Sequence, residues 1–105
     1  TCDAFGAKAD INFQKGYPAT INHKKQSEFA YESAKKIVGN KASSSQAPMM
    51  GSEDFSYFLK KIPGCFAWIG NGPSASLHNP KYDFNDSVLS IGSSFLASIA
   101  EDRLS

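Results

Sequence analysis

The stretch of sequence that could do the most chemistry runs from Leu77 to Asp86 and contains His78. A neutral imidazole is a good ligand for a divalent metal such as zinc or manganese, so His78 is a candidate metal ligand. No HExxH motif and no second histidine at local spacing accompanies it, and one histidine does not make a metal site. The alternative is a surface or half-buried histidine that is hydrogen-bonded to the backbone.

Acidic and amide side chains follow His78 at Asp83, Asn85 and Asp86. They resemble an acidic metal loop, but the spacing of an EF-hand is absent. Capping of a following helix by Asn85 or Asp86 explains them better. The other histidine, His23, has no partner spacing with His78, so we expect it to have a structural or solvent role.

A second candidate site is the pair Gly51 and Ser52, which opens a predicted helix. Free backbone N–H groups at a helix start can bind an anion such as a carboxylate or phosphate. The alternative is an ordinary N-cap formed by Ser52. Glu53 and Asp54 suit the first turn of a helix but repel an anion there, so they support the predicted helix start and argue against an anion site.

Other chemistries have no motif in this chain. There is no GxSxG for a nucleophilic serine, and no P-loop or GxGxxG for a nucleotide. Cys2 and Cys65 have no CxxC spacing and no histidine nearby, so neither a cysteine zinc site nor a cysteine nucleophile is indicated. We expect two free thiols, as in a reducing compartment.

The composition is that of one globular domain, with 105 residues, 41% of them hydrophobic and 20% charged. The net charge of +1 leaves no excess of positive charge that would attract nucleic acid or an anionic membrane. No apolar run approaches the roughly 18–20 residues that span a bilayer. We see no secretory signal and expect a cytoplasmic protein without nucleic-acid or membrane partners.

Hydrophobic periodicity predicts the elements that position these residues. Apolar side chains at helical spacing predict helices over Ser27–Val38, Ser52–Ile62 and Asp86–Leu104. Gly39 suits the C-terminal end of the first helix, and Val88 to Ala100 would supply the buried side of the last one. Gly70 to about Asp83 is predicted to be a long loop, and loops of that length are commonly functional or disordered.

Two strands are predicted between these helices. Alternation over Ala7–Gln14 predicts a strand with one buried face, and the apolar run Cys65–Ile69 predicts a strand that is buried on both faces. We expect that these strands do not pair with each other. Because a sheet normally needs three or more strands, the predicted set of elements looks incomplete.

The motifs together resemble one enzyme family, that of hippurate hydrolases and N-acyl-amino-acid amidohydrolases, which includes plant indole-acetyl-amino-acid hydrolases and aminoacylases. The resemblance lies in its carboxy-terminal part and spans nearly all of the chain. It is carried by Gly16-Tyr17-Pro18-Ala19-Thr20-Ile21-Asn22, Met50-Gly51-Ser52-Glu53-Asp54-Phe55, Pro63-Gly64, Ile69-Gly70-Asn71-Gly72 and Leu77-His78-Asn79-Pro80-Lys81-Tyr82-Asp83-Phe84-Asn85-Asp86.

The resemblance implies an α/β fold. Family members have a large catalytic domain with two divalent metals and a smaller α/β lid that usually dimerises. Residues 1–20 would be the end of that lid, including its last strand. Residues 21–105 would be the carboxy-terminal part of the catalytic domain.

The resemblance also implies roles for the candidate residues. His78 would be a metal ligand, and Gly51 and Ser52 would bind the substrate carboxylate. The two metal ions would be zinc, manganese or cobalt, and the substrate an N-acyl amino acid. The catalytic glutamate and the remaining ligands lie upstream in the family, and Glu53 does not match the base motif.

We therefore expect these 105 residues alone to hold no complete metal site and to be inactive, with the rest of the enzyme as their partner and a homodimer at full length. The alternative is a self-contained small binding or interaction domain without catalysis.

Overall fold

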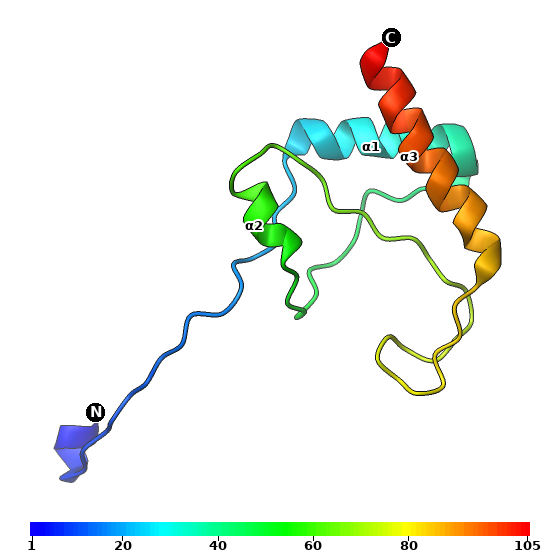
Figure 1. The fold of residues 1–105 in the computed structure, drawn as a ribbon. Coiled ribbons are helices and arrows are strands. Elements are labelled where there is room, and N and C mark those ends of the chain that lie inside the picture. Colours follow the sequence, from blue (N-terminus) through cyan, green and yellow to red (C-terminus); the bar gives the residue numbers. More distant parts are fainter.

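Three α-helices and three short 3-10 turns make up the regular structure, and there is no β-strand. The computed structural model describes residues 1–105 and is shown in Figure 1. The helices are α1 (Lys24–Val38), α2 (Phe55–Leu59) and α3 (Leu89–Leu104), and the turns are η1 (Cys2–Phe5), η2 (Gly39–Lys41) and η3 (Asp86–Val88). The three predicted helices are thus present, although their lengths differ from the prediction.

The main tertiary contact is the crossing of α1 and α3. Ala30 and Ser33 of α1 are buried. The Asp102 carboxylate of α3 accepts hydrogen bonds from Lys36 Nζ at 2.7 and 2.8 Å and from Ser33 Oγ at 3.2 Å. The Arg103 guanidinium lies 4.8 Å from the centre of the Phe29 ring. The ion pair, the Ser33 hydrogen bond and the contact between a cation and an aromatic ring therefore hold this crossing.

The α1 helix ends where the sequence predicts. Gly39 has φ 58°, a conformation that costs a side-chain-bearing residue energy, and its N–H donates to Lys35 O. Its start is three residues earlier than predicted, at Lys24 rather than Ser27. Helix ends shift easily by this amount, because the first turn depends on local capping rather than on the buried stripe.

The α2 helix is much shorter than the predicted Ser52–Ile62, since it covers only Phe55–Leu59. Leu59 and Ser56 are its buried residues. The ring of Phe55 lies 5.7 Å from that of Phe66. Aromatic contacts of this kind hold the short helix against the segment that follows it.

The predicted strand over Ala7–Gln14 is wrong for this structure. The segment has no regular structure and runs away from the rest of the chain as the blue ribbon of Figure 1. Ile11 and Phe13, two of the apolar residues in this alternation and so on its predicted buried face, are 80% and 81% exposed. A strand needs a neighbour to hydrogen-bond with, and the chain offers none here.

The predicted strand over Cys65–Ile69 is also wrong, for a related reason. Its backbone forms no ladder, and no ladder joins it to Ala7–Gln14. Instead the side chain of Asn22 takes the place of a neighbouring strand at Phe66. Asn22 Nδ2 donates to Phe66 O at 2.8 Å, and Phe66 N donates to Asn22 Oδ1 at 2.7 Å.

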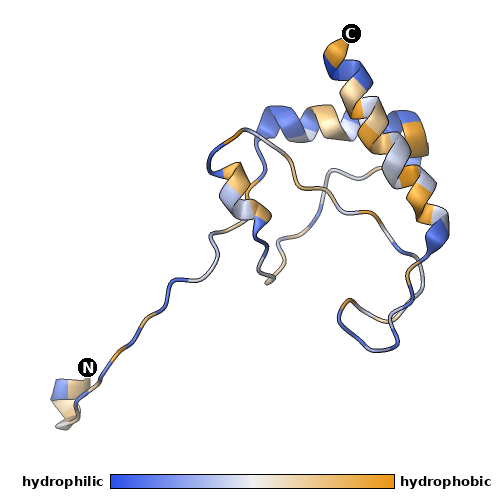
Figure 2. Cartoon of the chain, in the orientation of Figure 1, coloured by the Kyte–Doolittle hydropathy of each residue, from blue (hydrophilic) through white to orange (hydrophobic).

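Very little of the chain is buried. Four residues are buried in all, namely Ala30, Ser33, Ser56 and Leu59. No residue of α3 is among them, and the predicted buried side of this helix is only half-buried at Phe95 and Ile99 and is exposed at Leu96, by 67%. Figure 2 shows hydrophobic residues along α3 and along the segments without regular structure. The molecule therefore has a helix crossing but no hydrophobic core.

Candidate functional site

Asn71 closes the loop that carries His78. Its Nδ2 donates to Asp83 O at 2.7 Å, and its Oδ1 accepts from Asn85 N at 2.8 Å. One amide thus ties the start of the loop to two backbone groups at its end. The next residue, Gly72, has φ 80°, which a glycine adopts without steric cost.

Ser74 makes a second closure beside the first. Its hydroxyl accepts from Asp83 N at 3.1 Å and donates to Asp83 O at 3.1 Å. Because both polar backbone groups of Asp83 are satisfied in this way, the Asp83 side chain is not needed to hold the loop. We call residues 71–85, joined by Asn71 and Ser74, the closed loop.

His78 lies within the closed loop and has φ 67°, the left-handed region that residues with a side chain rarely adopt. The bond from Asn79 N to Ser76 O closes a turn that has His78 as its third residue, and the bond from Tyr82 N to Asn79 O closes a second turn directly after it. The imidazole is exposed and makes no hydrogen bond. The alternative of a histidine bonded to backbone is therefore not what the structure shows, and both ring nitrogens are available to a ligand.

The acidic residues near His78 do not form a cluster with it. No group of three or more His, Cys, Asp or Glu side chains anywhere in the chain could hold a metal ion. Asn85 has the predicted capping role, because its Oδ1 accepts from Ser87 N at 3.1 Å at the start of η3. The carboxylates of Asp83 and Asp86 make no hydrogen bond.

Gly51 and Ser52 are both exposed and precede α2 by several residues. The predicted N-cap role of Ser52 is wrong, because the N-cap residue of α2 is Asp54. The N–H of Phe55, which a Ser52 cap would have used, donates instead to Glu53 Oε1 at 3.2 Å. No contact joins His78 to Gly51 or Ser52, and Figure 1 shows the closed loop and the start of α2 as separate parts of the chain.

The structural role expected for His23 is confirmed. His23 N donates to Gly64 O at 3.1 Å, and Gly64 N donates to His23 Nδ1 at 3.2 Å. Together with Asn22, it fastens the start of α1 to the segment 64–66. Both cysteines are free thiols, as predicted.

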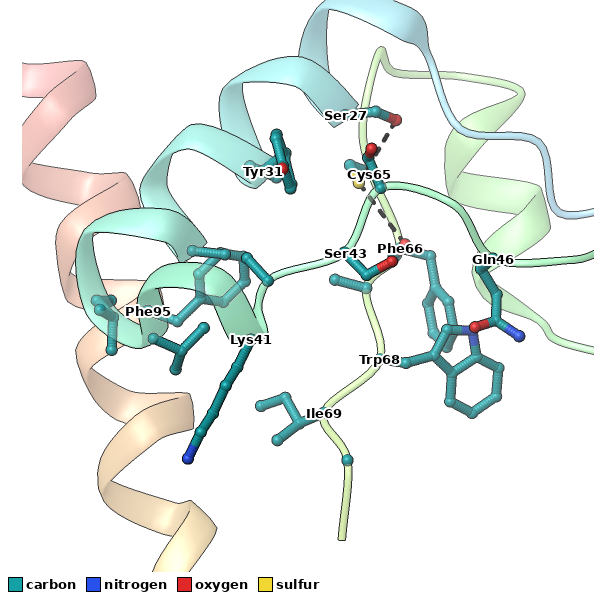
Figure 3. Close-up of a pocket in the computed structure, with 18 of the residues that line it drawn as sticks. Ser27, Tyr31, Lys41, Ser43, Gln46, Cys65, Phe66, Trp68, Ile69 and Phe95 are labelled. Carbon is teal, nitrogen blue, oxygen red and sulfur yellow. Dashed lines mark hydrogen bonds between the residues drawn. The ribbon is translucent and has the colours of Figure 1, made fainter. Parts of the chain in front are cut away.

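Two apolar pockets lie against the segment Cys65–Ile69. The larger is a cavity of about 630 Å³ between this segment, α1 and the chain after η2. Figure 3 shows Trp68, Ile69 and Phe95 around it, with Ser27 Oγ bonded to Cys65 Sγ at 3.7 Å. The smaller, of about 540 Å³, is lined by residues of α1 and α3 as well as this segment. Neither is lined by His78, Gly51 or Ser52.

Sequence reasoning did not predict these pockets. The sequence did contain an indication of them, because every residue of the run from Cys65 to Ile69 is apolar and apolar side chains on both faces of a segment favour burial.

No helix of the structure combines the length and the hydrophobicity that crossing a bilayer requires.

Comparison with known proteins places most of the chain in one family. Residues 6–102 match the model of "Peptidase family M20/M25/M40". The chain is 41% identical to an IAA-amino acid hydrolase (ILR1-like 2) of Arabidopsis thaliana, over 89% of this chain and 22% of the relative. It is 36% identical to a hippurate hydrolase of Campylobacter jejuni, over 86% of this chain and 24% of the relative.

An N-acetylcysteine deacetylase of Bacillus subtilis is 28% identical, over 91% of this chain and 25% of its own length. The chain thus spans about a quarter of the length of the curated relatives it matches. No solved structure matches it.

Proposed function

The chain belongs to peptidase family M20/M25/M40, and we propose that the protein carrying it is a metal-dependent amidohydrolase that cleaves the amide bond of N-acyl amino acids. The match over residues 6–102 carries this proposal, since it includes both α2 and the closed loop. The relatives are named for IAA-amino acids, hippurate and N-acetylcysteine. Each of these compounds joins an acyl group to an amino acid through an amide bond.

We assign His78 as one ligand of a pair of divalent ions, which would be zinc, manganese or cobalt. The chemistry of the donor fits, because the ring is exposed, makes no hydrogen bond and is a ligand that these metals accept. The other ligands would come from the rest of the enzyme, since these residues contain no cluster of three metal-binding side chains. Divalent ions bound there would polarise the amide carbonyl and lower the pKa of a bound water.

We assign Gly51 and Ser52 as the residues that bind the substrate carboxylate. Both are exposed, and the Ser52 hydroxyl makes no hydrogen bond within the chain, so it can donate to an anion. Glu53 is turned to the start of α2, where its carboxylate accepts from Phe55 N. Glu53 therefore has a structural role and is not proposed as the general base.

The domain assignment follows the same proposal. Residues 1–20 would be the end of a lid, or dimerisation, domain with an α/β fold, and residues 21–105 the carboxy-terminal part of the catalytic domain. The course of residues 7–16 away from the helices supports a boundary near Tyr17 (Figure 1). The partners would be the N-acyl amino acid, the upstream part of the enzyme and a second copy in a homodimer. The two free thiols suit the reducing cytoplasm.

The test is His78→Ala in the full-length enzyme. Loss of one imidazole should lower both the metal content, measured by elemental analysis, and the turnover of hippurate. Lys81→Ala is the matched control, because this exposed side chain in the same loop forms no hydrogen bond and no ion pair. Unchanged metal content and turnover in His78→Ala would refute the ligand role.

A self-contained binding domain is less well supported. A domain that folds alone buries a hydrophobic core, whereas only four residues are buried here. For the same reason we expect residues 1–105 alone, assayed with added zinc, manganese or cobalt, to show no appreciable hydrolysis of an N-acyl amino acid. Turnover near that of the full-length enzyme would show instead that this chain carries a complete site.

A further inference from the structure

The closed loop is held by very few interactions. It contains no regular structure between Gly72 and Asn85, and its large apolar side chains are exposed, with Leu77 at 56% and Phe84 at 47%. Hydrophobic burial therefore does little to fix its shape. The two ends are joined by the amide of Asn71 and the hydroxyl of Ser74, which bridge 12 and 9 residues of sequence respectively.

The left-handed backbone of His78 belongs to the turn that the bond from Asn79 N to Ser76 O closes, and the closure by Asn71 and Ser74 holds that turn in place. A residue with a side chain pays about 1–2 kcal/mol in the left-handed region, and the single hydrogen bond of this turn contributes roughly 0.5–1.5 kcal/mol, so in an open loop His78 can relax to a negative φ. Such a change of φ would swing the imidazole to a different direction. A metal ligand must be held in place to bind with useful affinity, and the groups that orient it matter nearly as much as the ligand.

We infer that Asn71 and Ser74 are positioning residues for His78, which fix the direction of its imidazole by closing residues 71–85. The inference rests on the proposed role of His78 as a metal ligand and extends it to two residues that do not touch the metal. Asn71 suits this role better than a charged residue, because its amide supplies one donor and one acceptor to two adjacent parts of the backbone.

The test measures the affinity of the full-length enzyme for Zn²⁺ by competition with a chromogenic chelator. Asn71→Ala and Ser74→Ala should each weaken binding, by roughly 10-fold or more, since loss of an orienting group typically costs 10–100-fold. Ser76→Ala is the matched control, because Ser76 lies in the same loop and its hydroxyl makes no hydrogen bond. Its affinity should equal that of the wild type. Ser74→Ala keeps the test open if Asn71→Ala does not fold.

A double-mutant cycle separates positioning from general destabilisation. Asn71→Ala should have no further effect on Zn²⁺ affinity when His78 is already alanine, because there is then no imidazole to orient. An equal loss in both backgrounds, or wild-type affinity in both single variants, would overturn the inference. If His78→Ala itself binds Zn²⁺ as the wild type does, the proposed ligand role fails first and the inference fails with it.

Discussion

At the scale of single residues, two buried serines differ in whether their hydroxyl has a partner. Ser33 is 1% exposed and donates to Asp102, whereas Ser56 is 0% exposed and its Oγ has no hydrogen-bond partner. A buried hydroxyl without a partner costs roughly 1–3 kcal/mol, and a satisfied one contributes roughly 0.5–1.5 kcal/mol.

We therefore predict opposite effects for the same substitution, made in the full-length enzyme. Ser33→Ala should lower the free energy of unfolding by about 1 kcal/mol. Ser56→Ala should leave it unchanged or raise it, because alanine removes the unsatisfied group and favours the helix. Urea denaturation of both variants measures this directly. A loss at Ser56 as large as that at Ser33 would mean that the Ser56 hydroxyl has a partner after all.

Asp102 gives the helix crossing a dependence on pH. The hydrogen bond from Lys36 lowers the pKa of the Asp102 carboxyl below its ordinary value of 3.8, and the Lys36 charge and the Ser33 and Ser98 hydroxyls act in the same direction, while desolvation opposes them. A carboxyl with a lowered pKa adds stability that is complete above its unfolded pKa and disappears as the pH falls through the folded one.

Asp102→Asn should therefore reduce the loss of stability as the pH falls below 3.8. The measurement is the urea midpoint of the full-length enzyme at a series of acidic pH values. Glu101→Gln is the control, since the neighbouring side chain is exposed and forms no ion pair. If both variants follow the wild-type curve, the ion pair between Asp102 and Lys36 does not contribute to stability.

At the scale of elements, α3 contains a glycine that the helix does not need. A Cβ placed on Gly92 would lie 3.1 Å from Ile69 Cδ1, which is the far end of a flexible and half-exposed side chain. Alanine in place of an interior glycine stabilises a helix by about 1 kcal/mol. Gly92→Ala should raise the free energy of unfolding by somewhat less than this, while Gly92→Val should lower it. Thermal unfolding of the full-length enzyme with either substitution distinguishes them, and a destabilised Gly92→Ala would show that Ile69 cannot move.

The elements also show what the sequence could predict. The spacing of Ala30, Ala34, Ile37 and Val38 predicts α1, because a helix satisfies its backbone internally and its signal is local. The strand predictions around Ile11 and within Cys65–Ile69 are wrong, because a strand forms only beside a neighbouring strand that shares its hydrogen bonds. Alternating or continuous apolar residues indicate a tendency to form a strand, but they do not identify the strand that would pair with it.

The candidate site was predictable to a similar degree. The type of His78 and its place in a long loop could be read from the sequence. The closure by Asn71 could not, because an asparagine after a glycine predicts only a turn. Its two long-range hydrogen bonds depend on where the chain returns at Asp83 and Asn85.

At the scale of the whole molecule, the chain is extended. Its radius of gyration is 19.5 Å, whereas a compact domain of this length has about 13 Å. The extents of 65 × 36 × 20 Å agree with the course of residues 7–16 in Figure 1. Much of the apolar surface that a domain would bury is therefore accessible, and Trp68 and Ile69 of the segment Cys65–Ile69, which lies against both pockets, are part of it.

We predict that residues 1–105 alone self-associate through this segment, because an extended apolar segment without a neighbouring strand can pair with a second chain. Ile69→Lys should suppress association, since Ile69 lines both pockets and a charge there would have to be buried. Met50→Lys adds the same charge at an exposed apolar residue that lines neither pocket, so it should associate as the wild type does. Sedimentation velocity over a range of protein concentrations measures the difference. Equal association of the two variants would show that the chain associates through another surface, and the exposed face of Ala7–Gln14 would then be the one to substitute next.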